Sequence, residues 1–243
     1  CYLVIGCASY RGYFSEQAAL DYAEKLRNEH DLETHVGGAI AYSTLGWFAD
    51  PVLSSMLKYG DLFLVELLIH ELTHQKLYVN NATDFNEAFA TFVAEQATRE
   101  WVTQSDPAKL VGYEHSQLRR AEFDQLIERH KRRLQAEYDQ GALPEELELK
   151  KRNLERMLKV EYQQLKAGSW NGFEGYDGWF DQPINNARLA AFSTYRKLVP
   201  EFRRVFETCN QDFARFFNAI ETNLDNDNQG LVALLNQGVL DCE

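Results

Sequence analysis

Apolar residues recur at helical spacing over most of the chain, with polar residues between them. A first amphipathic helix is predicted to begin after Ser15, whose side chain can cap it, and to run to about Asn28. Further helices are predicted over 61–78, 84–101 and 186–207, with shorter ones after them. Two apolar segments, 2–9 and 33–46, have the pattern of strands. The pattern therefore predicts an α+β fold, with a small N-terminal β-sheet and a mainly α-helical body.

Residues 107–167 differ from the rest in composition. They are rich in Glu, Lys, Arg, Gln and Leu and are interrupted by GALPEE at 141–146. This predicts two long helices joined by a turn, a helical hairpin. We interpret 1–243 as a single domain and 107–167 as a hairpin insertion within it. The hairpin charges are explained by a solvated surface, and the alternative is an arm that docks a partner.

Composition excludes some classes of protein. Hydrophobic residues make up 45% and charged residues 26%, which is typical of a folded globular protein. The net charge of −12 argues against a nucleic-acid partner. The apolar run LFLVELLI is too short to span a membrane.

Four cysteines, Cys1, Cys7, Cys209 and Cys242, allow three pairings. Free thiols and disulfides, with Cys1–Cys7 as a short loop, both stay open.

The sequence HELTH at 70–74 carries the strongest chemical signal. Residues four apart on a helix share a face, so His70 and His74 can present two imidazoles to one metal ion. Glu71, offset by one residue, can reach a water at that metal, as a metallohydrolase requires. The alternative is a buried helix whose histidines form hydrogen bonds with neighbours. The pentapeptide alone does not decide between the two.

A third ligand would favour a metal site, because catalytic zinc usually has three protein ligands and one open position. Glu87, in FNEAFATFVAE, lies thirteen positions after His74, where a short loop lets the next helix fold back. It has apolar neighbours, and a buried carboxylate needs a partner such as zinc. The alternative is a first-turn carboxylate favoured by the helix dipole. The pattern HExxHxxGxxH is absent, since Leu77 stands at its glycine position and Asn80 at its last histidine position.

The order of HELTH and FNEAF resembles the gluzincin pattern, and NEAFA is similar to the NEGFA of zinc aminopeptidases. GCASYRGYFSE, GGAIAYSTLGWFADPVLSSM, HELTHQKLYV, FNEAFATFVAE, GYDGWF and NNARLAAFSTYRKLVPEF together resemble a family of bacterial proteins described as predicted aminopeptidases. The segments span nearly the whole chain. The resemblance implies a zincin-like fold and a Zn²⁺ cofactor. It implies His70, His74 and Glu87 as ligands and Glu71 as general base.

Members of this family usually continue upstream, with an export signal or a lipoprotein anchor at the front. The resemblance thus implies a periplasmic protein, or one anchored to the membrane on the periplasmic side through a segment absent from this chain. Such a location favours disulfides. It also makes Cys1 an internal cysteine that carries no lipid.

Several residues are candidates for supporting roles. Thr91 and Glu95, one and two turns after Glu87, and Glu66, one turn before His70, are candidates to orient the zinc-binding histidines. Each of the three is equally explained as a surface residue.

The oxyanion formed on attack needs a hydrogen-bond donor besides zinc. Related enzymes supply a tyrosine from a downstream helix, so Tyr195 is the first choice. Tyr176 in the aromatic loop 168–183 is the second choice, and Tyr42 on the predicted strand is the third.

Residues near the start of the helix at 186–207 are candidates for holding substrate. They are Asn185, Asn186 and Arg188. Capping and bracing of that helix explains them equally well.

One departure concerns the free amine of the substrate. Zinc aminopeptidases often carry a glutamate in the strand before HExxH, where substrate adds as an extra strand. The corresponding GGAIAYS contains no carboxylate. The amine would then bind Glu66, Asp177 or Asp181, or the enzyme would be an endopeptidase.

The sequence as a whole predicts a zinc metallopeptidase that hydrolyses peptide bonds, with aminopeptidase as the first choice. The alternatives are a zinc endopeptidase, a non-peptide amidohydrolase, and a non-catalytic metal-binding assembly protein that docks through the hairpin. The expected partner is a peptide substrate. The sequence gives no oligomeric state.

Overall fold

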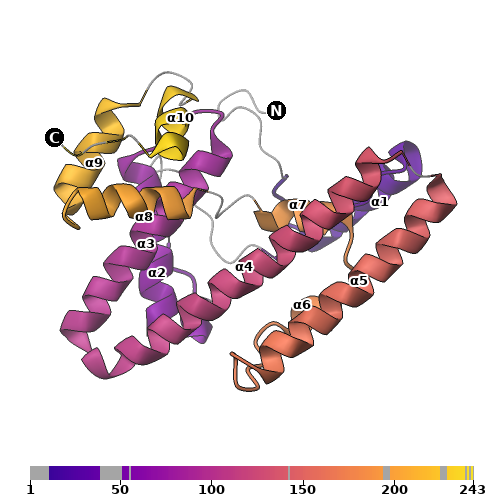
Figure 1. Ribbon diagram of the computed structural model, residues 1–243, viewed down its shortest axis with the longest axis horizontal. Coiled ribbons are helices and arrows are strands. Elements are labelled where there is room, and N and C mark those ends of the chain that lie inside the picture. Colours follow the sequence, from indigo (N-terminus) through magenta and orange to yellow (C-terminus); the bar gives the residue numbers. More distant parts are fainter. Residues whose placement is uncertain are drawn as a thin grey trace. The chain divides into compact units, whose positions relative to one another are not determined.

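The structure is a computed structural model that describes residues 11–38, 51–54, 56–141, 143–193, 198–224, 229–238, 240 and 242. These residues form helices and no strand (Figure 1). The prediction of an α+β fold is therefore wrong: the described part of the chain is all-helical. The first predicted strand, 2–9, and most of the second lie outside the described residues. None of the described helices is long and apolar enough to cross a membrane.

The described start of the second predicted strand, 33–38, is not in a strand and has other partners. The carbonyl of Thr34 accepts a hydrogen bond from the side chain of Asn185 at 2.9 Å. The carboxylate of Glu33 accepts from the backbone N–H of Asn186 at 2.6 Å and from Lys151 at 3.0 Å. Contacts with Lys151, Asn185 and Asn186 thus hold this segment, where a sheet would need a neighbouring strand. An apolar pattern does not reveal whether such a strand is available.

The chain divides into two compact units, 1–11 with 37–110 and 194–243, and 12–36 with 111–193. The first unit contains the helices η1 (Met56–Tyr59), α2 (Asp61–Lys76), α3 (Thr83–Ser105), η2 (Pro107–Lys109), α8 (Val199–Thr208), α9 (Phe213–Thr222) and α10 (Gln229–Gln237). Its core is built on the rings of Phe89 and Phe92 from α3, Phe202 from α8 and Phe216 from α9. Helix α3 is the central element, and it is the helix that carries Glu87.

A disulfide closes the C-terminal part of the first unit. Cys209, fully buried at the end of α8, pairs with Cys242, and their Cα atoms are 5.0 Å apart. Arg215 adds a hydrogen bond to the carbonyl of Cys242 at 3.0 Å. This is one of the three pairings that the sequence left open. The Cys1–Cys7 pair lies outside the described residues.

The second unit contains α1 (Glu16–His30), nearly all of α4 (Leu110–Asp139), α5 (Pro144–Ala167), α6 (Asp177–Phe180) and α7 (Asn186–Ser193). Its core joins Phe123 and Ile127 of α4 to Leu158 and Tyr162 of α5. The turn after α4 includes Gly141, whose φ of 66° is one that glycine adopts without strain. Helices α4 and α5 occupy the segment interpreted as a hairpin, and its status as an insertion in a single domain stays a prediction.

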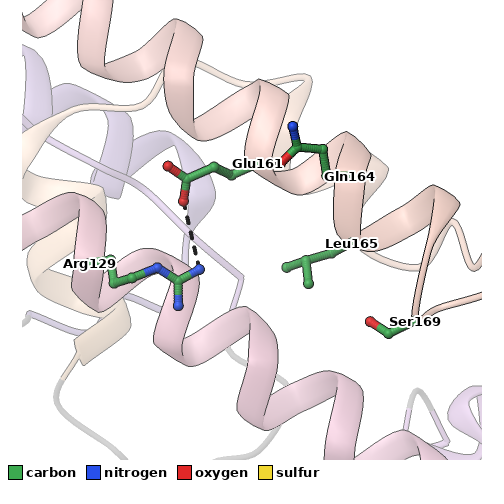
Figure 2. Close-up of a pocket in the computed structure, with 5 residues that line it drawn as sticks. All are labelled: Arg129, Glu161, Gln164, Leu165 and Ser169. Atoms are coloured by element: carbon green, nitrogen blue, oxygen red, sulfur yellow. Dashed lines mark ion pairs between the residues drawn. The ribbon is translucent and has the colours of Figure 1, made fainter.

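An open hollow lies between α4 and α5 (Figure 2). Arg129, Glu161, Gln164, Leu165 and Ser169 line it. Arg129 pairs with Glu161 at 3.7 Å, and Arg133 contacts the same carboxylate. None of the residues predicted to act on a substrate lines this hollow.

Candidate metal centre

Helix α2 presents two histidines on one face. The helix begins after Gly60, which has a φ of 85°, and ends at Lys76, before Leu77, whose backbone is extended. His70 and His74 are one turn apart, so their rings lie on the same side. Ile69 packs against the first unit's core and fixes the rotation of the helix. The sequence of α2 thus places both imidazoles at the boundary between the core and solvent.

A buried asparagine holds the connection from α2 to α3. The side-chain oxygen of Asn86 accepts from the N–H of Val79 at 2.9 Å, and its amide donates to the carbonyl of Val79 at 2.7 Å. Asn86 is 1% exposed, so both bonds are shielded from water. This clamp fixes the path of residues 77–82. It thereby sets the position of Glu87 relative to His74.

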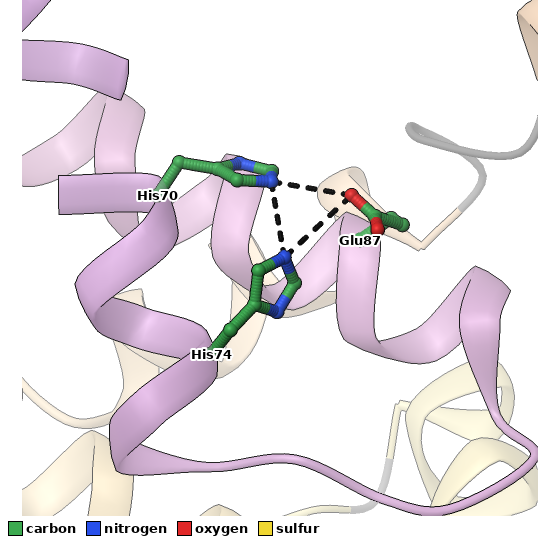
Figure 3. A group of neighbouring side chains, drawn as sticks. All are labelled: His70, His74 and Glu87. Atoms are coloured by element: carbon green, nitrogen blue, oxygen red, sulfur yellow. Dashed lines mark hydrogen bonds and ion pairs between the residues drawn. The ribbon is translucent and has the colours of Figure 1, made fainter. Parts of the chain in front are cut away.

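The three predicted ligands converge on one point (Figure 3). Nε2 of His70 lies 3.2 Å from Nε2 of His74 and 3.2 Å from Oε2 of Glu87. Nε2 of His74 lies 3.7 Å from the same oxygen. Ligand atoms about 2.0–2.2 Å from a tetrahedral metal ion are about 3.3–3.6 Å apart. The three atoms therefore fit the face of a metal tetrahedron, and the donor set of two imidazoles and one carboxylate suits a divalent ion.

The electrostatics of the group favour an ionised carboxylate. Burial opposes ionisation of Glu87, but hydrogen bonds from His70 and His74, with the charge of these imidazoles, outweigh it and lower the pKa of Glu87 to about 2. The Glu87 side chain is 14% exposed. A buried carboxylate that stays ionised needs positive charge beside it, which a metal ion would also supply.

Glu71 lies next to His70 on α2 and is half-buried. Within the described part of the chain, it has no hydrogen-bond or ion-pair partner. Its carboxylate is therefore available for proton transfer. Its role as general base stays a prediction.

None of the residues predicted to orient the histidines has a described hydrogen bond to His70 or His74. Glu95 is 3% exposed, and its carboxylate lies 3.4 Å from the guanidinium of Arg203. Thr91 and Glu66 are half-buried on α3 and α2. Nδ1 of His74 is buried without a hydrogen-bond partner in the described structure. The orienting roles of these residues thus stay predictions.

The tyrosines predicted to stabilise the oxyanion are not brought to the metal group by any described contact. Tyr195 and Tyr42 lie outside the described residues. Tyr176 belongs to the second unit, where its ring stacks on Phe123 with centroids 4.1 Å apart. The packing of Tyr176 is that of a core residue of its unit.

The residues predicted to hold substrate brace the second unit. Arg188 is 5% exposed and donates to three backbone carbonyls, those of Trp179 at 2.6 Å, Gln182 at 3.1 Å and Pro183 at 3.2 Å. Asn185 accepts from the backbone N–H of Arg188 at 2.9 Å, near the start of α7. Asn186 donates to the hydroxyl of Tyr138 at 2.7 Å. These contacts match the capping and bracing alternative. Burial also lowers the pKa of Arg188.

One carboxylate considered for the substrate amine is engaged within the second unit. Asp177 accepts hydrogen bonds from Lys166 at 2.6 Å and from the hydroxyl of Tyr162. These contacts, that of Lys166 first, lower the pKa of Asp177. Asp177 thus serves to anchor the start of α6 to α5.

Two residues near the metal group were not identified from the sequence. Asn86 directly precedes Glu87, and the pairing of these two letters in FNEAF was the available signal. Tyr78 lies four positions after His74, and their ring centroids are 6.1 Å apart. Four-residue spacing does not indicate Tyr78, because α2 ends at Lys76 and the backbone of Leu77 is extended.

Two histidines one turn apart and a glutamate from the next helix define a candidate metal centre of a kind that metallohydrolases use. Residues 1–230 match the family model described as "Putative aminopeptidase". The chain therefore belongs to this family, and the resemblance is confirmed at that level. Membership suggests a peptidase. No curated protein and no solved structure matches the chain.

Proposed function

We propose that the protein is a zinc-dependent metallopeptidase, an aminopeptidase, with His70, His74 and Glu87 as its zinc ligands. One observation carries the proposal: three ligand atoms from two helices lie 3.2–3.7 Å apart in a triangle. Two protonated imidazoles would repel each other at this distance. Neutral imidazoles that share a cation with the Glu87 carboxylate avoid this repulsion, and the cation then contacts all three atoms.

Zinc is the metal that this donor set favours. Two imidazole nitrogens, one carboxylate oxygen and no sulfur form a set typical of catalytic zinc, which keeps a fourth position open. When bound, zinc would polarise the scissile carbonyl and lower the pKa of water at that position. Family membership supports a peptide as the substrate.

The chain's own residues would perform the proton transfers. The carboxylate of Glu71 takes a proton from the attacking water, whose oxygen bonds to the scissile carbonyl carbon. The C–N bond of the substrate then breaks, and Glu71 gives that proton to the leaving amine. Its half-buried position and the absence of a described partner support this role.

Four proteins test the proposal: the wild type, His70→Ala, Glu71→Gln and the control His115→Ala, which alters an exposed histidine of α4. Zinc content and hydrolysis of a peptide library would be measured for each. We expect about one zinc per wild-type chain and loss of zinc in His70→Ala. Glu71→Gln should keep zinc and lose at least 100-fold in kcat. A wild type without zinc, or with zinc but no peptide hydrolysis, contradicts the proposal.

The library would contain each peptide with a free and with a blocked N-terminus. An aminopeptidase cleaves only the free form. Cleavage of both forms would favour the endopeptidase alternative, which the absence of a carboxylate in GGAIAYS supports.

We further propose a periplasmic or membrane-anchored location. The Cys209–Cys242 disulfide supports an oxidising compartment, where such bonds persist. Fractionation of cells that express the full natural gene product, with thiol labelling of each fraction, tests this. A cytosolic protein with labelled Cys209 would contradict it.

A further inference from the structure

The connection between α2 and α3 directs one tyrosine away from the core. Leu77 is extended, with φ −146° and ψ 121°, and successive side chains of extended backbone point to opposite sides. Leu77 and Val79 are each 7% exposed and belong to the first unit's core. Tyr78, between them, is 39% exposed. It therefore points to the side that the core does not occupy.

The same connection is held firmly at its next residue. Both backbone groups of Val79 are paired with the buried amide of Asn86, at 2.9 and 2.7 Å. The backbone on the C-terminal side of Tyr78 is thus anchored to α3 at Asn86, the residue before Glu87. On the other side, the N–H of Leu77 donates to the carbonyl of Thr73 at 2.9 Å. Tyr78 therefore sits on a fixed piece of backbone, as a preorganised group requires.

The ring of Tyr78 lies against a metal ligand. It meets the ring of His74 edge-on, with centroids 6.1 Å apart and planes at 76°. This is an ordinary arrangement for an aromatic pair. The Tyr78 hydroxyl forms no hydrogen bond in the described structure. A phenol beside the metal group is therefore available to donate to a ligand there.

We propose that Tyr78 is a catalytic residue whose hydroxyl donates a hydrogen bond to the carbonyl oxygen of the substrate as that oxygen gains negative charge. The inference rests on the proposed peptidase function. A fixed donor is effective because it needs no reorganisation during the reaction. Tyr78 thereby takes the role for which the sequence named Tyr195, Tyr176 and Tyr42. It is the tyrosine that a described contact places beside a proposed ligand.

Tyr78→Phe tests the hydroxyl, because it keeps the ring that contacts His74. The control is Tyr59→Phe, since Tyr59 also lies in the first unit, is 57% exposed, and contacts Phe63 with centroids 4.8 Å apart. We expect kcat to fall about 100-fold in Tyr78→Phe, with KM and zinc content unchanged. Tyr59→Phe should match the wild type. Equal kcat in Tyr78→Phe and the wild type overturns the inference.

A second measurement does not depend on turnover. Proteins loaded with Co²⁺ would be titrated with acetohydroxamate, whose oxygens bind the metal and accept hydrogen bonds. We expect Tyr78→Phe to weaken hydroxamate binding about 10-fold at unchanged metal affinity. If the wild type binds the hydroxamate but cleaves no peptide, the peptidase proposal fails. The hydroxamate affinity of Tyr78→Phe then tests by itself whether the Tyr78 hydroxyl donates to a ligand at the metal. Equal hydroxamate binding then overturns the inference, and a chain that binds no metal overturns both.

Tyr78→Ala separates catalysis from packing. If Tyr78 only supports the ring of His74, Tyr78→Phe behaves as the wild type and Tyr78→Ala loses metal affinity. That result overturns the inference. If the hydroxyl donates as proposed, both variants lose kcat by a similar factor.

Discussion

The two units use polar side chains in different ways. In the second unit, the guanidinium of Arg188 is satisfied by three backbone carbonyls, and Asp177 is satisfied by Lys166 and Tyr162. In the first unit, His70, His74 and Glu87 direct two imidazole nitrogens and a carboxylate oxygen at one another. Polar groups that complete a fold find their partners within it. Polar groups from two helices that converge on one point can share a partner from outside the chain, which supports the proposed metal site in the first unit.

Two buried histidines, one in each unit, offer the sharpest test of this difference. His74 is 7% exposed and His130 of α4 is 4% exposed, and each has a buried Nδ1 without a partner in the described structure. We expect His74→Ala to lose zinc and at least 1,000-fold in kcat/KM, because a ligand is gone. His130→Ala should keep zinc and activity and lose only stability. Zinc analysis and peptide hydrolysis of the folded proteins check this, and zinc loss in His130→Ala would contradict it.

A second test removes the brace of the second unit. Arg188→Met leaves three carbonyls without their donor and removes a guanidinium that lies 4.3 Å from the ring centre of Trp179. We expect the free energy of unfolding to fall by about 3 kcal/mol, with zinc content unchanged. Urea unfolding would measure it, with exposed Arg152→Met as control. If Arg188→Met keeps wild-type stability but loses activity, Arg188 binds substrate and does not brace the fold.

A third test uses the pH dependence of the metal-free protein. The pKa of Glu87 is lowered from 4.5 to about 2, so its ionised form stabilises the folded state. That contribution is fully present above about pH 4.5 and is lost as the pH falls toward 2. We expect Glu87→Gln to be less stable than the wild type at pH 5 by on the order of 2 kcal/mol. The difference should shrink as the pH approaches 2, and a constant difference would contradict the ionised pair.

The candidate ligands could be predicted from sequence because their placement depends on local geometry. The four-residue spacing of His70 and His74 needs only a helix, and the short connection to Glu87 needs only that the next helix fold back. The α+β fold class was wrong for the described part of the chain, because strand pairing depends on segments distant in sequence. At 33–34, Glu33 and Thr34 form hydrogen bonds with Lys151, Asn185 and Asn186. The disulfide could not be predicted either, because the sequence alone does not choose among the three possible pairings of four cysteines.

The hydrogen-bond donor for the oxyanion could not be predicted from the sequence for a different reason. The sequence contains twelve tyrosines, and the choice among them followed the resemblance to related enzymes. Tyr78 was missed because its direction depends on two contacts that no periodicity shows. These contacts are the burial of its neighbours and the clamp of Asn86 on Val79. Residues that position a site through backbone contacts leave little trace in a sequence pattern.

The smallest expected effect concerns that clamp. Asn86→Ala leaves the N–H and carbonyl of Val79 buried and unpaired, so the connection between the ligand helices loosens. Groups that orient metal ligands typically change affinity 10- to 100-fold, and Asn86 acts through the backbone, so we expect about a 10-fold weaker zinc affinity. Competition with a chelator measures it, and Asn80→Ala, exposed in the same connection, is the control. If Asn86→Ala loses stability but binds zinc as tightly as the wild type, the clamp holds only the fold. In that case only His70, His74 and Glu87, and not Asn86, would distinguish the polar groups of the first unit from those of the second.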